Sequence, residues 1–153
     1  MLAPSALAKK TPYLGPLLGP PAQEPGSSVY FKVVSKGKGR KLHPVMVLKF
    51  GYSYLDVTCT DASGLEPTRV SSLVGESTPV RGREFELTQA GTSGLGNGTY
   101  TVETHGRIPR KGPATGTIHY TASYVLPDTG LTTCDSTTAW SATITDPNNF
   151  PSK

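Results

Sequence analysis

Alternation of apolar and polar residues runs through the chain from residue 28 to residue 145. In the segment "SVYFKVV", Val29, Phe31 and Val33 fall on one face of an extended strand, and the residues between them fall on the other. A period of two is typical of a β-strand with one buried face. The pattern predicts eight or nine strands and no helix. The clearest segments are "KLHPVMVLKF", "SYLDVTC", "EFELT", "TYTVETHGRI", "ATGTIHYTASY" and "TTCDSTTAWSATI".

The clearest pair of strands is a hairpin within residues 98–124. Its two strands are separated by "PRKGP", which has proline at both ends and glycine inside, as turns do. The two inward-facing sets match when the numbers of paired residues add up to about 222. This register places Val102 opposite Tyr120 and Gly106 opposite Gly116. Two opposed glycines leave a thin place in the sheet, so we expect another element to approach closely there.

The last strand, residues 132–144, carries the only tryptophan of the chain and the second of its two cysteines. Cys134 and Trp140 are six residues apart, so they fall on one face of the strand together with Ile144. Small residues fill most of the positions between them. We interpret the segment as a core strand, with Trp140 as the marker of the core.

Composition agrees with an all-β fold. Glycine (17) and proline (14) are abundant, and both favour turns. The length of 153 residues suits one domain with its own core. We therefore predict an antiparallel β-sandwich, jelly-roll or immunoglobulin-like, or a related open barrel. No segment offers the run of about 20 apolar residues that crossing a bilayer requires, so no membrane span is expected.

The segments around the predicted β-sandwich domain, residues 28–145, are expected to be irregular. Residues 9–27 contain five prolines, which exclude a helix and disfavour a central strand. We interpret this segment as a Pro-rich linker, within which "TPYLG" is a candidate edge strand. Residues 60–79 resemble a loop, with a short strand near "TRVSSLV". Residues 146–153 are predicted to form an unstructured C-terminal tail.

The N-terminus suggests export. Ala6-Leu7-Ala8 has small residues at the positions that signal peptidase recognises, and two lysines follow. The apolar run that should precede such a site is missing. We interpret residues 1–8 as the remnant of a signal peptide, against the alternative of an ordinary N-terminus. The expected location is extracellular or the cell envelope.

The two cysteines, Cys59 and Cys134, each stand at the end of an apolar strand face. They are either two buried thiols or one disulfide, and an exported chain favours the disulfide. A bridge between residues 75 apart would contribute on the order of 4 kcal/mol through chain entropy. A zinc site is disfavoured because the chain has no CxxC and no close Cys/His pair.

Positive charge is concentrated in the first third of the chain. Residues 1–50 carry eight Lys/Arg and one Glu, which gives +7, whereas residues 51–153 carry seven Lys/Arg and ten Asp/Glu, which gives −3. Part of the basic excess lies in "SKGKGRK", with Lys36, Lys38, Arg40 and Lys41. This segment is either a patch for an anionic partner or a solvated hairpin loop. We favour the loop and expect no nucleic acid partner, because no aromatic side chains for base stacking stand beside it.

Candidate catalytic chemistry is sparse. The hairpin register places Glu103 opposite His119, with His105 on the same outer face. Such a set could hold a metal, or it could be a charge-paired solvated surface, which we favour. No phosphate-binding loop, G-x-S-x-G or H-E-x-x-H motif occurs. We assign no catalytic residue and expect no cofactor.

Four tyrosines are candidates for ligand binding. A solvent-facing tyrosine on a sandwich can stack on a sugar ring, since it offers an apolar body with a polar tip. Alternatively, these side chains cover sheet edges or contact the N-terminal linker. The four residues are Tyr30, Tyr52, Tyr54 and Tyr124.

The order "VYFKVVSKGK", "YLDVT" before a cysteine, "EFEL", "YTVETHGRI", "ATGTIHY" and "CDSTTAWSA" resembles small secreted domains of high-GC Gram-positive (actinobacterial) soil bacteria. These domains commonly end in C-[DS]-S-G-x-x-x-W-[ST]-A. Thr137 stands here where that motif has glycine, and Ile108 stands where an earlier motif commonly has phenylalanine. The resemblance implies export, an all-β domain and a cysteine pair. It implies no activity, so it assigns no functional residue.

The sequence therefore predicts a secreted or cell-envelope β-sandwich domain that acts as a non-enzymatic binding module. Its partner would be a cell-wall polymer, a polysaccharide or a protein. The alternatives are a carbohydrate-binding module that uses the exposed tyrosines and a metal-dependent enzyme that uses Glu103, His105 and His119.

Overall fold

The computed structural model describes residues 8–61, 64–74, 77–92, 98–127 and 130–150. The described residues form nine β-strands and two single-turn 3₁₀ helices, and they contain no α-helix. None of them belongs to a helix that is long and apolar enough to cross a bilayer. The strands are β1 (Lys9–Gly19), β2 (Ser28–Lys36), β3 (His43–Asp61), β4 (Gly64–Val74), β5 (Thr78–Pro79), β6 (Glu84–Thr92), β7 (Thr99–Arg107), β8 (Ala114–Leu126) and β9 (Gly130–Ile144).

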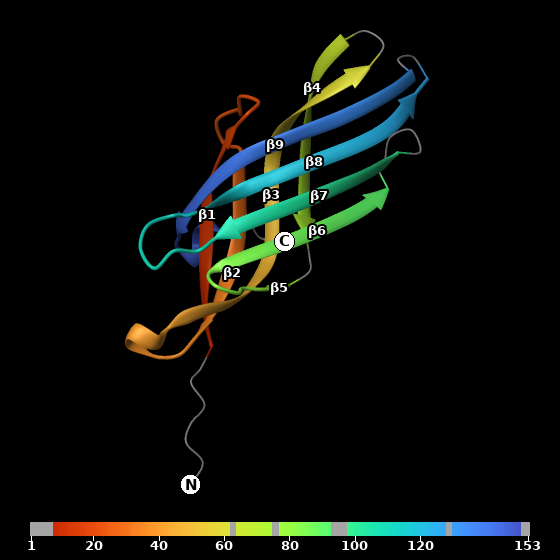
Figure 1. Ribbon diagram of the computed structural model, residues 1–153. Helices are drawn as coiled ribbons and strands as arrows, with labels where there is room; N and C mark the ends of the chain where they lie inside the picture. Colours follow the sequence, from red (N-terminus) through yellow and green to blue (C-terminus); the bar gives the residue numbers. More distant parts are fainter. Residues whose placement is uncertain (1–7, 62–63, 75–76, 93–97, 128–129, 151–153) are drawn as a thin grey trace.

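The strands form one antiparallel sheet that folds back on itself. Its order in the described residues is β4-β3-β2-β1-β9-β8-β7-β6, and β5 pairs with β3. Strands β6–β9 cross in front of β1–β4 in Figure 1, so the sheet makes two layers. The predicted all-β antiparallel fold is confirmed. Within the runs β4-β3-β2-β1 and β9-β8-β7-β6, neighbours in the sheet are also neighbours in the sequence. The pairings of β1 with β9, β3 with β5 and β3 with β9 join strands that are not consecutive.

Residues 9–19 are a central strand, and their prediction as part of a linker was wrong. β1 pairs with β2 on one side and with β9 on the other. Tyr13 and Leu17 are buried, and the Tyr13 ring stacks on Phe31 with 5.1 Å between the centroids. Prolines are tolerated in this strand because a proline lacks the N–H but its carbonyl oxygen can still accept a hydrogen bond. The N–H of Thr145 donates to the carbonyl of Pro12 in this way.

Strand β3 is longer than the sequence pattern indicated, because two predicted strands are one. Its pairing with β2 and β4 shifts register near Lys49 and Tyr54, which both have positive φ, 54° and 58°. These are β-bulges, which bend a strand and reverse its alternation. Beyond the second bulge, β3 reaches β9 and pairs Cys59 with Cys134.

The predicted disulfide is present. Cys59 and Cys134 are bonded, and their Cα atoms lie 4.0 Å apart. The bridge joins the end of β3 to the beginning of β9, and both sulfur-bearing residues are buried.

The core is aromatic and lies between the two layers. Phe31, Phe50, Phe85 and Trp140 form a cluster in which every ring has a neighbour within 5.5–6.3 Å. Trp140 is 1% exposed, which confirms it as the core marker.

The predicted register of the β7–β8 hairpin is confirmed. Val102 pairs with Tyr120, Glu103 pairs with His119, and Gly106 pairs with Gly116. The element that approaches the two glycines is the Trp140 side chain: a Cβ added to Gly116 would lie 2.5 Å from the indole.

Two other segments are more ordered than predicted. Residues 60–79, predicted as mostly loop with a short strand near "TRVSSLV", include all of β4 and all of β5. At the C-terminus, Pro147–Asn149 forms a 3₁₀ turn, and the Phe150 ring meets Tyr30 edge-on at 5.6 Å. The rest of the predicted tail, residues 151–153, and the predicted signal-peptide remnant at residues 1–8, except Ala8, lie outside the described residues.

Candidate functional site

A cavity of about 170 Å³ lies at one end of the molecule. Its walls come from the beginning of β1, the β2–β3 hairpin, the turn before β6 and the β7–β8 turn. The hairpin and the β7–β8 turn both project at the left of Figure 1. Sheet pairing brings the first two walls together, since Lys9 of β1 lies opposite Ser35 of β2, which in turn lies opposite Pro44 of β3.

Positive charge dominates the cavity. Three permanently cationic side chains, Lys9, Arg83 and Arg110, line it together with His43. None of the described residues that line the cavity is acidic. Because the described walls carry several cations and no carboxylate, the cavity is suited to an anion.

Arg83 is held in place by the end of β7. Its Nε–H donates to the carbonyl oxygen of Ile108 at 2.9 Å, and the N–H of Ile108 donates to the Arg83 carbonyl at 2.8 Å. Arg83 also has φ of +66°, a left-handed conformation that costs about 1 kcal/mol or more in a residue with a side chain. The reciprocal hydrogen bonds stabilise this conformation. A guanidinium has five N–H donors, so most remain for a ligand.

Hydroxyl and apolar groups complete the walls. Thr11, Tyr13 and Ser35 supply hydroxyl groups, and Ile108 and Ile144 supply apolar surface. Burial raises the pKa of Tyr13, and the positive charge of Arg83 lowers it in part. The Tyr13 hydroxyl therefore stays protonated at neutral pH and can donate a hydrogen bond to an anion.

His43 is oriented by a local hydrogen bond. Its Nδ1 lies 2.8 Å from the carbonyl oxygen of Lys41 and donates to it. The other ring nitrogen, Nε2, is then the one that can face a ligand.

The basic segment that the sequence pointed out lies directly beside this cavity. Lys36 is paired with His43 across β2 and β3, and Lys38, Arg40 and Lys41 follow at the tip of the hairpin. All four side chains are exposed. The segment is a hairpin loop, as predicted, but it also borders a cationic cavity. Sequence reasoning missed Lys9, Arg83 and Arg110, which belong to no motif.

The structure does not gather the candidate metal ligands into one site. His119 Nε2 lies 2.8 Å from the Asp135 carboxylate, and its Nδ1 lies 3.7 Å from Glu103. His105 instead lies 3.3 Å from Glu86. No group of three or more potential metal ligands occurs among the described residues. The geometry matches the charge-paired surface that we favoured.

The four candidate tyrosines do not form a common face. Tyr52 and Tyr124 are buried, so they cannot stack on a ligand. Tyr30 is half-buried, and its ring covers Gly51 and meets Phe150. Tyr54 alone of the four is largely exposed, at 57%. In a regular strand, Tyr52 and Tyr54 would point to the same face. The bulge at Tyr54 reverses the alternation, so Tyr52 is buried whereas Tyr54 faces solvent.

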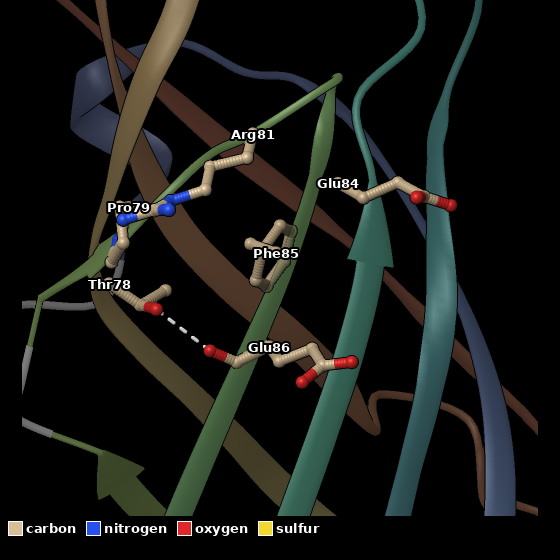
Figure 2. Close-up of a pocket in the computed structure, with 6 residues that line it drawn as sticks. All are labelled: Thr78, Pro79, Arg81, Glu84, Phe85 and Glu86. Carbon is tan, nitrogen blue, oxygen red and sulfur yellow. Dashed lines mark hydrogen bonds between the residues drawn. The ribbon is translucent and has the colours of Figure 1, made fainter.

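A larger cavity, of about 330 Å³, lies between β5 and β6. Phe85 forms its floor, and Thr78 crosses it by donating a hydrogen bond to the Glu86 carbonyl at 2.7 Å. Figure 2 shows the carboxylates of Glu84 and Glu86 directed toward β7, away from Arg81. They pair there with Arg107 and His105. This cavity therefore lacks a convergent set of charged groups.

A second cluster of charges lies on β3 and β4 and is internally paired. The Arg69 guanidinium binds both carboxylate oxygens of Asp56, at 2.9 and 3.3 Å, and lies 3.8 Å from Glu24. The Gln23 side chain accepts from the backbone N–H of Asp56 and donates to its carbonyl. These contacts attach residues 20–27 to β3, which is a structural role.

No protein-family model matches the chain, and comparison with curated proteins and with solved structures found no significant match. Function is therefore inferred from the chemistry of the site.

Proposed function

We propose that the protein is a non-catalytic, exported domain, secreted or in the cell envelope, that binds an acidic ligand in the basic cavity. One observation carries this proposal: three cations and a histidine, from segments far apart in the sequence, line a cavity whose described walls contain no carboxylate. They are Lys9, His43, Arg83 and Arg110.

Binding fits the cavity better than catalysis. A nucleophilic mechanism needs a hydroxyl or thiol beside a base, and the base in turn needs an orienting group. The described walls offer hydroxyl groups, but His43 is oriented by a backbone carbonyl rather than by a carboxylate. Cationic and hydroxyl groups together supply hydrogen bonds and charge to an anion.

The disulfide supports the export part of the proposal. Disulfides persist in oxidising compartments and are rare in the cytosol of mesophiles. The Cys59–Cys134 bridge connects β3 to β9 in the core of the fold.

Isothermal titration of the full chain with citrate and with inorganic phosphate, at low ionic strength, tests the proposal. We expect binding that is lost in the Lys9→Gln/Arg110→Gln variant. Lys10→Gln/Lys49→Gln is the matched control, because it also removes two charges and both exposed lysines lie outside the cavity lining. Equal binding by the cavity variant and the unmodified protein would overturn the proposal. Failure of both citrate and phosphate to bind would overturn it as well.

A further inference from the structure

The size of the cavity limits what enters it. Its volume of about 170 Å³ is small beside the roughly 300–1,000 Å³ of typical small-molecule sites. That volume accommodates one sulfate, phosphate or carboxylate group with a few attached atoms. A larger ligand must therefore continue outside the cavity.

Cations continue outside it as well. The 3₁₀ turn Gly39–Lys41 directly precedes Leu42 and His43, which line the cavity. Arg40 and Lys41 lie on this turn, Lys38 precedes it, and Lys36 pairs with His43. Lys36 lies on the strand next to His43, about 4.8 Å away, and the other three exposed cations follow in the turn. We call these four residues, which extend from the cavity to the tip of the hairpin, the basic track.

In the part of the chain that the structure describes, the basic track is not paired with carboxylates. Among the described residues, no ion pair joins Lys36, Lys38, Arg40 or Lys41 to a carboxylate. The carboxylates of the front layer pair instead with His105, Arg107 and His119, and those of residues 24 and 56 pair with Arg69. The basic charge of this end is therefore available to a partner.

We propose that the ligand is a linear acidic glycan, which places one acidic group in the cavity and lays further acidic groups along the β2–β3 hairpin. This inference rests on the proposed function of the cavity. A nucleic acid fits less well, because single strands bind through aromatic platforms and the hairpin from Lys36 to Lys41 contains no aromatic residue. A glycan that carries acidic groups at intervals can bind through ion pairs and hydrogen bonds alone, and the cations and hydroxyl groups of the cavity and the hairpin supply both.

Oligogalacturonates of defined length, from one unit to about ten, are the probe, and dextran sulfate tests sulfate in place of carboxylate. We expect the affinity of the full chain to rise roughly a hundredfold or more from monomer to decamer, since linked contacts add. Salt should weaken decamer binding more steeply than monomer binding, because more ion contacts form. Dextran of the same length, which is uncharged, should not bind.

Two variants separate the parts of the site. Lys38→Gln/Arg40→Gln/Lys41→Gln should weaken decamer binding roughly tenfold or more and leave monomer binding unchanged. Lys9→Gln/Arg110→Gln should weaken both. All these substitutions are on exposed or rim positions, and Lys10→Gln/Lys49→Gln serves again as the control for the loss of two charges elsewhere.

The outcomes are distinguishable. Two outcomes overturn the glycan inference and leave the anion-binding proposal in place. One is an affinity that does not increase from the monomer to the decamer, and the other is decamer binding that the hairpin substitutions do not weaken. Failure of both citrate and phosphate to bind overturns the anion-binding proposal and, with it, the glycan inference that rests on it. Tighter binding of an oligothymidylate than of an oligogalacturonate of equal charge overturns the glycan in favour of a nucleic acid.

Discussion

Trp140 lies directly opposite Gly116 in the pairing of β8 and β9, and its indole occupies the space that a side chain at position 116 would need. Gly106, the partner of Gly116 on β7, has the same indole and the Phe85 ring close by. The absence of side chains at the two glycines therefore makes room for the Trp140 indole, the largest side chain of the core.

Substitution of Gly116 by alanine is the first prediction. The added Cβ would overlap the indole and the backbone carbonyl of His105, so we expect a loss of about 3 kcal/mol or more in the free energy of unfolding. Chemical denaturation measures it. Thr115→Ala, an exposed neighbour on the same strand, should change stability by less than about 0.5 kcal/mol. Equal stability of the Gly116→Ala variant and the unmodified protein would contradict the packing.

Reduction of the disulfide is the second prediction. The Cys59–Cys134 bridge closes a loop of 75 residues, and its loss should lower the free energy of unfolding by about 4 kcal/mol. Denaturation of the Cys59→Ala/Cys134→Ala variant measures this loss. The single variants should lose about as much as the double variant, since either one removes the bridge. A double variant as stable as the oxidised protein would refute the expectation.

The third prediction concerns Gln23, whose side chain takes the place of a neighbouring strand beside Asp56. Its amide makes two hydrogen bonds of 2.9 Å with the Asp56 backbone. Gln23→Ala leaves both backbone groups without this partner and should cost about 1–3 kcal/mol in denaturant unfolding. Glu24→Ala removes only the 3.8 Å surface contact with Arg69 and should cost at most about 1 kcal/mol. The reverse order of the two losses would be inconsistent with the structure.

The fourth prediction is a loss of stability in alkaline solution. Burial raises the pKa of Tyr52, and the neighbouring Tyr120 raises it further; burial also raises the pKa of Tyr13, Tyr30 and Tyr120. The folded protein therefore keeps phenol protons that the unfolded chain releases near pH 10. The stability from these neutral phenols is complete below about pH 10 and falls as the pH rises above it, by up to roughly 1.4 kcal/mol per pH unit for each group.

Denaturation at several pH values between about 8 and 11.5 checks this slope. Tyr52→Phe retains the buried ring but has no proton to release, so its stability should fall less steeply above pH 10. An identical slope for the variant and the unmodified protein would exclude Tyr52 as a contributor.

Local pattern was enough for part of the fold. The β7–β8 register followed from alternation and one turn, because adjacent strands joined by a short turn have little freedom in how they pair. The position of Trp140 on the core face followed from the same alternation. In contrast, the prolines of β1 obscured its buried face at Tyr13 and Leu17, and the bulges at Lys49 and Tyr54 changed which residues of β3 face outward.

The candidate site was less accessible from the sequence. The basic hairpin was visible as a run of lysine and arginine, but its interpretation as a solvated loop omitted the cavity beside it. That cavity needs Lys9, Arg83 and Arg110, which are isolated residues without a motif.

The sequence by itself determined the strands with clean alternation, the pairing of the β7–β8 hairpin and the two cysteines available to bond, because these depend on neighbouring residues or on chemistry that each residue carries. Only the tertiary structure decided that β1 lies between β2 and β9 and that cations spread over residues 9–110 meet at one end. Such meetings depend on how distant strands pair and on where β3 bends, and both arise from packing of the whole core.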